Sequence, residues 1–153
     1  MKRTLFTFAV VLFTTVAVVA QPRAIGGRLG YGVEASYQHG FGEANFLQLD
    51  AGLAGYGSAF QLTGTYNWIF ATPEWGDYGK WEWFGGVGAG LGFGGGRFFA
   101  GVAGNIGLAF TFDFPLQLSV DYRPLLGPSF GDGNVSFNYI GVYSFGLGVR
   151  YAF

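Results

Sequence analysis

The stretch FGLGVRYAF, residues 145–153, decides how the rest of the chain is interpreted. Its alternate positions are apolar or aromatic: Phe145, Leu147, Val149, Tyr151 and Phe153. An arginine, Arg150, lies between them. Alternation of period two predicts a β-strand with one apolar and one polar face. Exposed to water, an apolar stripe on a strand promotes aggregation, so the fold depends on which solvent this stripe faces.

The composition argues against a water-facing surface. The chain has 153 residues, which favours a single domain, and half of them are hydrophobic. Only 11% are charged, whereas soluble domains contain roughly 25%. The 29 glycines lie among apolar residues, which indicates sheet and tight turns rather than a polar linker.

Several classes of function are excluded or disfavoured. The absence of cysteine excludes disulfides, cysteine zinc sites, a thiol nucleophile and the lipid attachment of bacterial lipoproteins. The net charge of −1 gives no basic surface for nucleic acid. His39 is the only histidine, which leaves little material for a metal site. We therefore expect neither a cofactor nor a nucleic-acid partner.

Residues 1–20 have the features of a cleaved secretory signal peptide. Lys2 and Arg3 precede an apolar run over residues 5–19, and Val18 and Ala20 are the small residues that signal peptidase favours. A retained membrane anchor is the alternative, but the run is short for spanning and no charged flank follows it. We expect cleavage after Ala20 and a single exported domain over residues 21–153.

The exported part contains alternating segments instead of long apolar runs. We predict seven strands, over residues 27–38, 45–55, 59–70, 80–93, 98–112, 116–123 and 137–153. All charges within these strands fall on the polar parity: Arg28, Glu34, Asp50, Lys80, Glu82, Asp121, Arg123 and Arg150. Four of the eight are basic and four are acidic, so a shared interior can pair them.

This sidedness predicts an all-β fold, a transmembrane antiparallel up-and-down β-barrel. In such a barrel alternate residues face lipid and their neighbours face the lumen. The polar face carries too few charges and too many glycines to be a good water surface, whereas the apolar face suits hydrocarbon. The opening stripe then faces lipid and Arg150 faces inward. A soluble calycin-like barrel, with the apolar parity turned inward, is the competing interpretation.

In this expected architecture the exported chain resembles the small outer-membrane β-barrels of Gram-negative bacteria, of the OmpA and OmpX type. The segment FGLGVRYAF resembles the C-terminal signal that the barrel-assembly machinery binds, and FPLQLSVDYRP, residues 114–124, resembles the penultimate strand. The resemblance implies an eight-stranded barrel in the outer membrane, a largely plugged interior, and outer-membrane lipid and that machinery as partners. We expect the eighth strand either from residues 21–28 or from a division of residues 135–153.

All four tryptophans, Trp68, Trp75, Trp81 and Trp83, occur between residues 68 and 83. Strand alternation places them on one rim together with Phe153, which predicts an interfacial aromatic girdle. Because the family implies that Phe153 is periplasmic, we expect this rim to be periplasmic. The segment RPLLGPSFGDGN, residues 123–134, is then predicted to be the longest external loop.

Two motifs suggest chemistry. Ser36, His39 and Glu43 are the only serine, histidine and acid within one short stretch, as a hydrolase would need, although His39 fits a turn at a membrane rim. Gly90, Gly92 and Gly95 match a dinucleotide-binding pattern, but that site requires a helix to follow. We interpret the strand glycines as room for large inward side chains such as Phe84 and Phe99.

The expected function is a structural or surface role without catalysis, with the inward charges acting as a plug. Eight-stranded barrels are just wide enough for side chains to fill them. A narrow channel for ions or small solutes is the second hypothesis, and a lipid-modifying barrel enzyme is the third.

Overall fold

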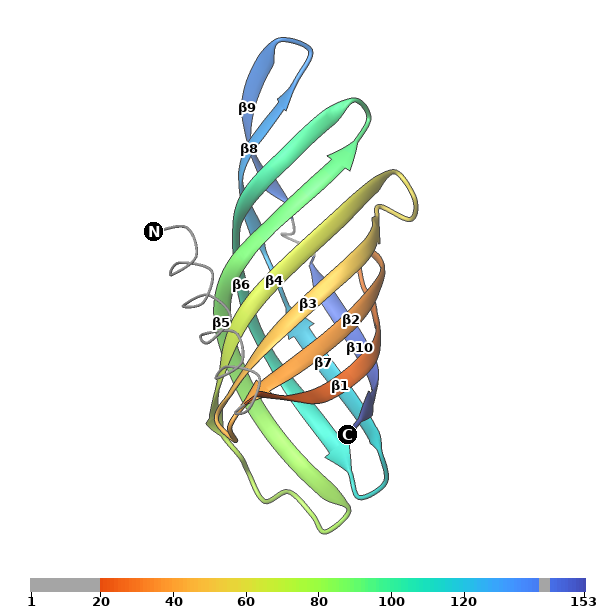
Figure 1. Ribbon diagram of the computed structural model, residues 1–153, viewed down its shortest axis with the longest axis vertical. Helices are drawn as coiled ribbons and strands as arrows, with labels where there is room; N and C mark the ends of the chain where they lie inside the picture. The colour runs from red at the N-terminus through yellow and green to blue at the C-terminus, as the bar shows by residue number, and fades with distance from the viewer. Residues whose placement is uncertain (1–19, 141–143) are drawn as a thin grey trace, which may run out of the picture.

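The computed structural model describes residues 20–140 and 144–153. Nearly all of the predicted signal peptide, residues 1–19, lies outside the described residues, as do residues 141–143 of the predicted last strand. The described part is built from strands (Figure 1). None of its residues form a helix long and apolar enough to cross a membrane.

The described residues form ten strand segments. Their bounds are β1 (Ala20–Leu29), β2 (Gly32–Phe41), β3 (Asn45–Ala54), β4 (Ala59–Ala71), β5 (Gly79–Gly94), β6 (Arg97–Phe112), β7 (Leu116–Tyr122), β8 (Leu125–Gly131), β9 (Asn134–Ile140) and β10 (Phe145–Ala152). Neighbours pair antiparallel throughout, and β1 pairs with β10, which closes the sheet.

The ten segments make a closed barrel of eight strands. β7 and β8 both pair with β6, one beyond the other, so together they form one long strand that is interrupted at Arg123 and Pro124. β9 pairs with β8 and β10 pairs with β7, so these two segments form the next long strand. The predicted all-β barrel class and its strand number are therefore confirmed.

The eighth strand is β1, Ala20–Leu29, which corresponds to residues 21–28, the first of its two predicted sources. Residues 27–38 are not one strand, because β1 ends at Leu29 and β2 begins at Gly32. Leu29 pairs with Val33 across the turn, and both side chains are exposed on the outer face. The turn keeps the apolar parity, so the alternation in the sequence passes through it without a break.

The prediction of a long external loop over residues 123–134 is wrong. Most of this segment is β8, and the connection to β9 is a tight turn at Asp132 and Gly133, both with positive φ. Positive φ at both central residues is the geometry that favours a two-residue hairpin. Pro128 lies in β8, where the ladder to β6 skips Gly127 and Pro128 and so needs no N–H from proline.

The two ends of the barrel differ (Figure 1). Both described chain ends lie at one end, together with the connections over residues 42–44, 72–78 and 113–115, and we call this end the terminal rim. The opposite end has tight turns, such as Gly95–Gly96 between β5 and β6. There the hairpins β5–β6 and β8–β9 extend beyond β1 and β2. The longest described connection, residues 72–78, is therefore at the terminal rim.

The barrel is apolar outside and polar inside. Large apolar side chains at alternate positions of the strands are exposed on the outer wall, among them Ile25, Val33, Leu53, Val87, Val102, Ile106, Val120 and Val149. Most of the buried side chains are polar or charged, and the largest of them include Arg28, Arg123 and Arg150. This is the reverse of the usual arrangement in a soluble domain, where charged groups are almost never fully buried.

Candidate functional site

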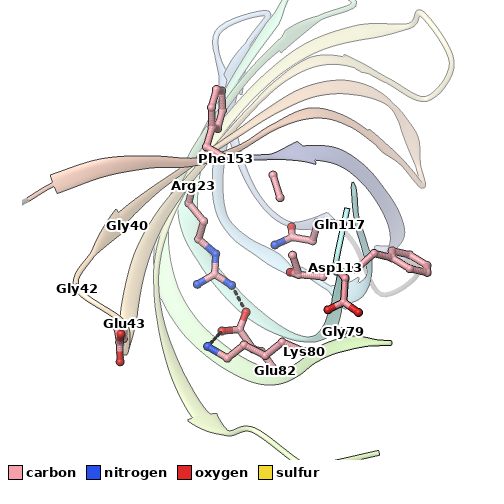
Figure 2. A pocket seen from close by; sticks show the side chains of 13 residues that line it. Arg23, Gly40, Gly42, Glu43, Gly79, Lys80, Glu82, Asp113, Gln117 and Phe153 are labelled. Carbon is pink, nitrogen blue, oxygen red and sulfur yellow. Dashed lines mark hydrogen bonds and ion pairs between the residues drawn. The ribbon is translucent and has the colours of Figure 1, made fainter. Parts of the chain in front are cut away.

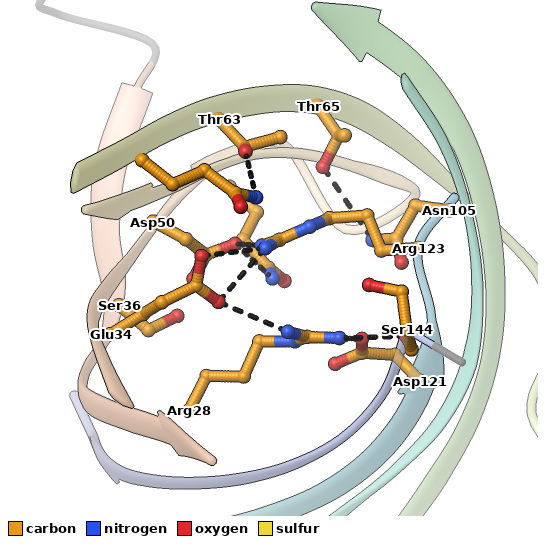
Figure 3. Close-up of polar contacts among 12 residues, drawn as sticks. Arg28, Glu34, Ser36, Asp50, Thr63, Thr65, Asn105, Asp121, Arg123 and Ser144 are labelled. Carbon is orange, nitrogen blue, oxygen red and sulfur yellow. Dashed lines mark hydrogen bonds and ion pairs between the residues drawn. The ribbon is translucent and has the colours of Figure 1, made fainter. Parts of the chain in front are cut away.

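The centre of the barrel contains a layer of ionic groups from several strands (Figure 3). Arg28 of β1 donates from Nε to Asp121 Oδ1 of β7 at 2.8 Å and from Nη1 to Glu34 Oε2 of β2 at 3.0 Å. Its Nη2 also donates to the carbonyl oxygen of Ser144 at 3.1 Å. Because Arg28 is only 2% exposed, these contacts replace the water that the charge has lost.

Glu34 joins this arginine to a second one. Arg123 Nη2 donates to both carboxylate oxygens of Glu34, at 2.7 and 2.8 Å, and Arg123 Nη1 donates to Asp50 Oδ2 of β3. Glu34 therefore lies between two guanidinium groups. The result is a connected network of two arginines and three carboxylates, Glu34, Asp50 and Asp121.

Arg150 of β10 lies beside this network without a carboxylate of its own. Its Nε donates to Ser36 Oγ at 2.8 Å, and its Nη1 donates to Ser119 Oγ at 2.7 Å. With Arg150 included, the buried centre holds three arginines and the three carboxylates, so it carries no net charge. A neutral, hydrogen-bonded cluster is the form in which ionic groups tolerate burial.

Glycines of β10 make room for these arginines. A β-carbon built on Gly146 would overlap the guanidinium of Arg28, and one on Gly148 would overlap that of Arg150. The glycines of β5 and β6 serve bulky side chains in the same way. A β-carbon built on Gly107 would lie 2.5 Å from Cζ of Phe84, and one on Gly101 would lie 2.7 Å from Cζ of Phe99. The predicted role of the strand glycines thus agrees with the packing.

A second ionic cluster lies at the terminal rim. Glu82 of β5, which is buried, accepts from Arg23 Nη2 and from Lys80 Nζ, the latter at 2.9 Å. The Lys80 side chain is 58% exposed, so it lies at the mouth and not in the buried network that the sequence predicted for it. Glu82 also belongs to this cluster and forms no ion pair with the described residues of the central one.

Sequence alternation missed Arg23. The register between β1 and β2 shifts between Pro22 and Ala24, so Arg23 is the extra residue of a β-bulge. A β-bulge interrupts the alternation of side chains between the two faces and changes the direction in which a side chain points. Arg23 consequently reaches Glu82 and lies over the Phe46 ring, with 4.5 Å from Cζ to the ring centroid. No pattern in the sequence marks the bulge.

An aromatic pair separates the two ionic clusters. Phe46 of β3 and Phe84 of β5 are both 1% exposed and make an edge-to-face contact with 5.3 Å between ring centroids. Ala109 and Ile69 pack against them. Further toward the opposite end, Phe99, Ala103 and Leu125 form another buried apolar cluster. The lumen is thus filled by ionic groups, apolar clusters and hydrogen-bonded amides such as the Gln38–Gln48 and Asn67–Asn105 pairs.

A cavity of about 790 Å³ opens at the terminal rim, and we call it the vestibule (Figure 2). Arg23, Lys80 and Glu82 lie on one side and Gln117 of β7 on another. Further lining residues are Gly40, Gly42, Glu43, Gly79, Thr111, Phe112, Asp113, Ala152 and Phe153. At the opposite end, the space beside Arg28, Glu34 and Arg123 is only about 10 Å³.

The tryptophans lie on the outer wall near the terminal rim. Trp75, in the connection 72–78, contacts Trp81 and Trp83 of β5 with ring-centroid distances of 5.6 and 6.5 Å. Trp81 also contacts Phe110 of β6 at 4.5 Å, and Trp68 of β4 contacts Tyr66 at 5.1 Å. Residues that the sequence predicted as a girdle therefore share one outer band.

The residues of the predicted assembly signal lie where their alternation requires. Phe145, Leu147, Val149, Tyr151 and Phe153 are between 50% and 72% exposed on the outer face of β10. Arg150, between them, is 1% exposed and points inward. β10 pairs with β1 along most of its length, so this stripe borders the seam at which the barrel closes.

The structure does not assemble Ser36, His39 and Glu43 into a catalytic triad. Ser36 is buried inside the barrel and accepts from Arg150, whereas His39 lies on the outer parity of β2 between Tyr37 and Phe41. Tyr37 Oη is 2.7 Å from His39 Nδ1. Because Ser36 and His39 project from opposite faces of one strand, the histidine cannot activate that serine. The Gly90–Gly95 pattern is followed by the strand β6.

No group of three histidine, cysteine, aspartate or glutamate side chains within residues 20–140 and 144–153 is arranged to hold a metal ion. Comparison with known proteins adds no relative, since no protein-family model, curated protein or solved structure matches this chain.

Proposed function

We propose that this chain is a small integral outer-membrane β-barrel of a Gram-negative bacterium, with a structural or surface role and an interior plugged by paired charges. The observation that carries the proposal is the reversed sidedness of the wall. Branched and aromatic side chains cover the outside, and fully buried arginines lie inside. Closed barrels suit lipid because every strand is paired and no edge remains.

The sequence supports the location. Residues 1–20 have the charge and apolar pattern of an export signal, and FGLGVRYAF resembles the segment that the barrel-assembly machinery binds. The aromatic band around Trp75 and Trp81 fits the headgroup region of a bilayer, where amphipathic rings collect. We infer that the terminal rim is periplasmic, which places the hairpins β5–β6 and β8–β9 on the outside.

The filling of the lumen favours a plug over a channel. Between the vestibule and the opposite end, the path meets Arg23 over Phe46, then the Phe46–Phe84 pair, then the ionic layer. An open pore needs a continuous passage for ions or solutes. The buried side chains that fill the lumen, and the space of only about 10 Å³ beside the central network, argue against one. A structural role therefore accounts for the interior better than conduction does.

Fractionation of a Gram-negative host that expresses the full chain tests the proposal. We expect the protein in the outer-membrane fraction, soluble only with detergent, and with a gel mobility that changes when the sample is boiled. A protein recovered from the periplasm as a monomer that remains soluble without detergent would contradict it. That result would instead support a soluble barrel.

Two further measurements separate the competing functions. The folded protein in a planar bilayer should show no discrete conductance steps, whereas regular steps would favour a narrow channel. An assay of lipid A deacylation should give the same result for the wild-type protein and for His39→Ala. A loss of deacylation in that variant would favour the enzyme hypothesis.

A further inference from the structure

We infer that the vestibule is a binding site for a short peptide with free termini, such as a tripeptide. The inference goes beyond the proposed function, because the cavity has this chemistry whether or not the barrel lies in a membrane. Its volume of about 790 Å³ is within the range of small-molecule sites, roughly 300–1,000 Å³. The polar groups that line the cavity, and those among them that lack hydrogen-bond partners, indicate the class of ligand.

Two buried polar atoms of the vestibule lack hydrogen-bond partners among the described residues. Gln117 is 1% exposed, and its Oε1 accepts no hydrogen bond. Arg23 Nε, a donor, is also unpaired. Both side chains extend into the same cavity (Figure 2). Since buried polar groups in proteins are almost always paired, an unpaired acceptor and an unpaired donor together indicate a missing partner.

A peptide group supplies both complementary atoms. Its N–H can donate to Gln117 Oε1 and its carbonyl oxygen can accept from Arg23 Nε. A single ion would satisfy one of these atoms and not the other. Because both atoms are buried, binding requires that the two side chains rotate toward the cavity. The class of ligand is therefore one that contains an amide.

The charges around the cavity match the two ends of a peptide. Lys80 Nζ donates to Glu82 at 2.9 Å, and since an ammonium has three donors it retains hydrogen-bonding capacity for a carboxylate. Glu43 and Asp113 are exposed at the mouth, and neither forms an ion pair with a described residue. They provide acceptors for an ammonium group. Asp113 lies on the strand connection next to Lys80, and Glu43 lies across the mouth from it, so the cavity presents charges of both signs. Such a mouth suits a zwitterion better than an ion of one sign.

The test is a titration of the full folded protein in detergent micelles, followed by amide chemical shifts, with three probes. Trialanine has free termini and peptide groups, N-acetyl-trialanine amide lacks the terminal charges, and alanine lacks the peptide groups. We expect saturable shifts at vestibule residues with trialanine. Binding of the other two probes should be about tenfold weaker or more, because each loses one set of partners.

Matched variants locate the site. Gln117→Leu removes the unpaired amide and should weaken trialanine binding about tenfold. Gln61→Leu is the control, because Gln61 is also a buried glutamine of the lumen but lies beside the small space at the opposite end. It should bind trialanine as the wild type does. Lys80→Met, at an exposed position, provides a second variant if Gln117→Leu fails to fold.

Three outcomes would overturn the inference. One is the absence of saturable shifts, which would mean that water alone occupies the vestibule. Another is equal binding of trialanine and the capped peptide, and the third is an equal effect of Gln117→Leu and Gln61→Leu. Failure of the membrane proposal gives a different signature, namely a protein soluble without detergent, and the same titration can then be done in buffer.

Discussion

Gly146 has no side chain, and the guanidinium group of Arg28 occupies the space that a side chain at residue 146 would fill. The two residues lie on the paired strands β1 and β10, at the seam of the barrel. Gly146 is therefore part of the ionic layer, although it has no polar side chain. The size of a residue on one strand determines whether a charge on the next can reach its partners.

This relationship predicts that Gly146→Ala destabilises the barrel. The added methyl group displaces Arg28 from Asp121 and Glu34, and overpacking of this kind costs about 1–3 kcal/mol. Urea unfolding of the protein in lipid vesicles measures the loss as a lower midpoint. Gly92→Ala is the control, since a β-carbon there has only ordinary contacts at 3.6 Å, and its midpoint should stay close to that of the wild type.

A second prediction concerns the buried ion pairs. Asp121→Asn removes the charge that faces Arg28 and leaves the guanidinium inadequately compensated, at a cost of about 3–5 kcal/mol. Asp132→Asn should cost less than about 1 kcal/mol, because Asp132 is 82% exposed and is 4.0 Å from Arg97. The same unfolding assay compares the two. Equal losses would mean that the central network contributes no more than a surface pair.

The bulge at Arg23 gives a third prediction. Arg23→Met deprives the buried Glu82 of its less exposed partner, which is 18% exposed, and should destabilise the protein by about 2–3 kcal/mol. Lys80→Met removes the exposed partner and should cost less than about 1 kcal/mol. If Lys80→Met were the more damaging variant, Arg23 would not be the principal counter-ion of Glu82.

The position of the tryptophans predicts a fluorescence result. In vesicles, lipids brominated near the headgroup should quench the emission more strongly than lipids brominated near the end of the acyl chain, because all four tryptophans lie close to one rim. Trp75→Phe should leave this depth preference unchanged, since the remaining three share the band. Efficient quenching by aqueous iodide with no effect of brominated lipids would contradict the predicted girdle.

The sequence predicted which face most strand residues occupy, because side-chain alternation in a strand is fixed by backbone geometry. Arg28, Glu34 and Asp50 lie inside as their parity requires, and Phe145 lies outside. The same rule explains the errors. The turn after Leu29 preserves the parity, so β1 and β2 were predicted as parts of a single strand. The bulge at Arg23 changes the parity, so this inward charge was not predicted to lie in a strand.

The contacts within the lumen could not be predicted from the sequence. Parity places Glu34 and Glu82 on the same face, yet Glu34 pairs with Arg28 and Arg123 whereas Glu82 pairs with Arg23 and Lys80. Which charges meet depends on the stagger of neighbouring strands and on the height of each residue in the barrel. Those quantities follow from strand register, and seven strands with approximate limits do not determine it.

The ionic layer also has a consequence for how the protein folds. Arg28 comes from β1, Glu34 from β2, Asp50 from β3 and Asp121 from β7, so its members arrive from opposite ends of the chain. A half-assembled sheet in lipid would present unneutralised charges to hydrocarbon. If the barrel lies in a membrane as proposed, we expect partly paired intermediates to be disfavoured. The joining of β1 to β10 should then be a late step that is coupled to neutralisation of the interior, so that assembly is nearly all-or-none.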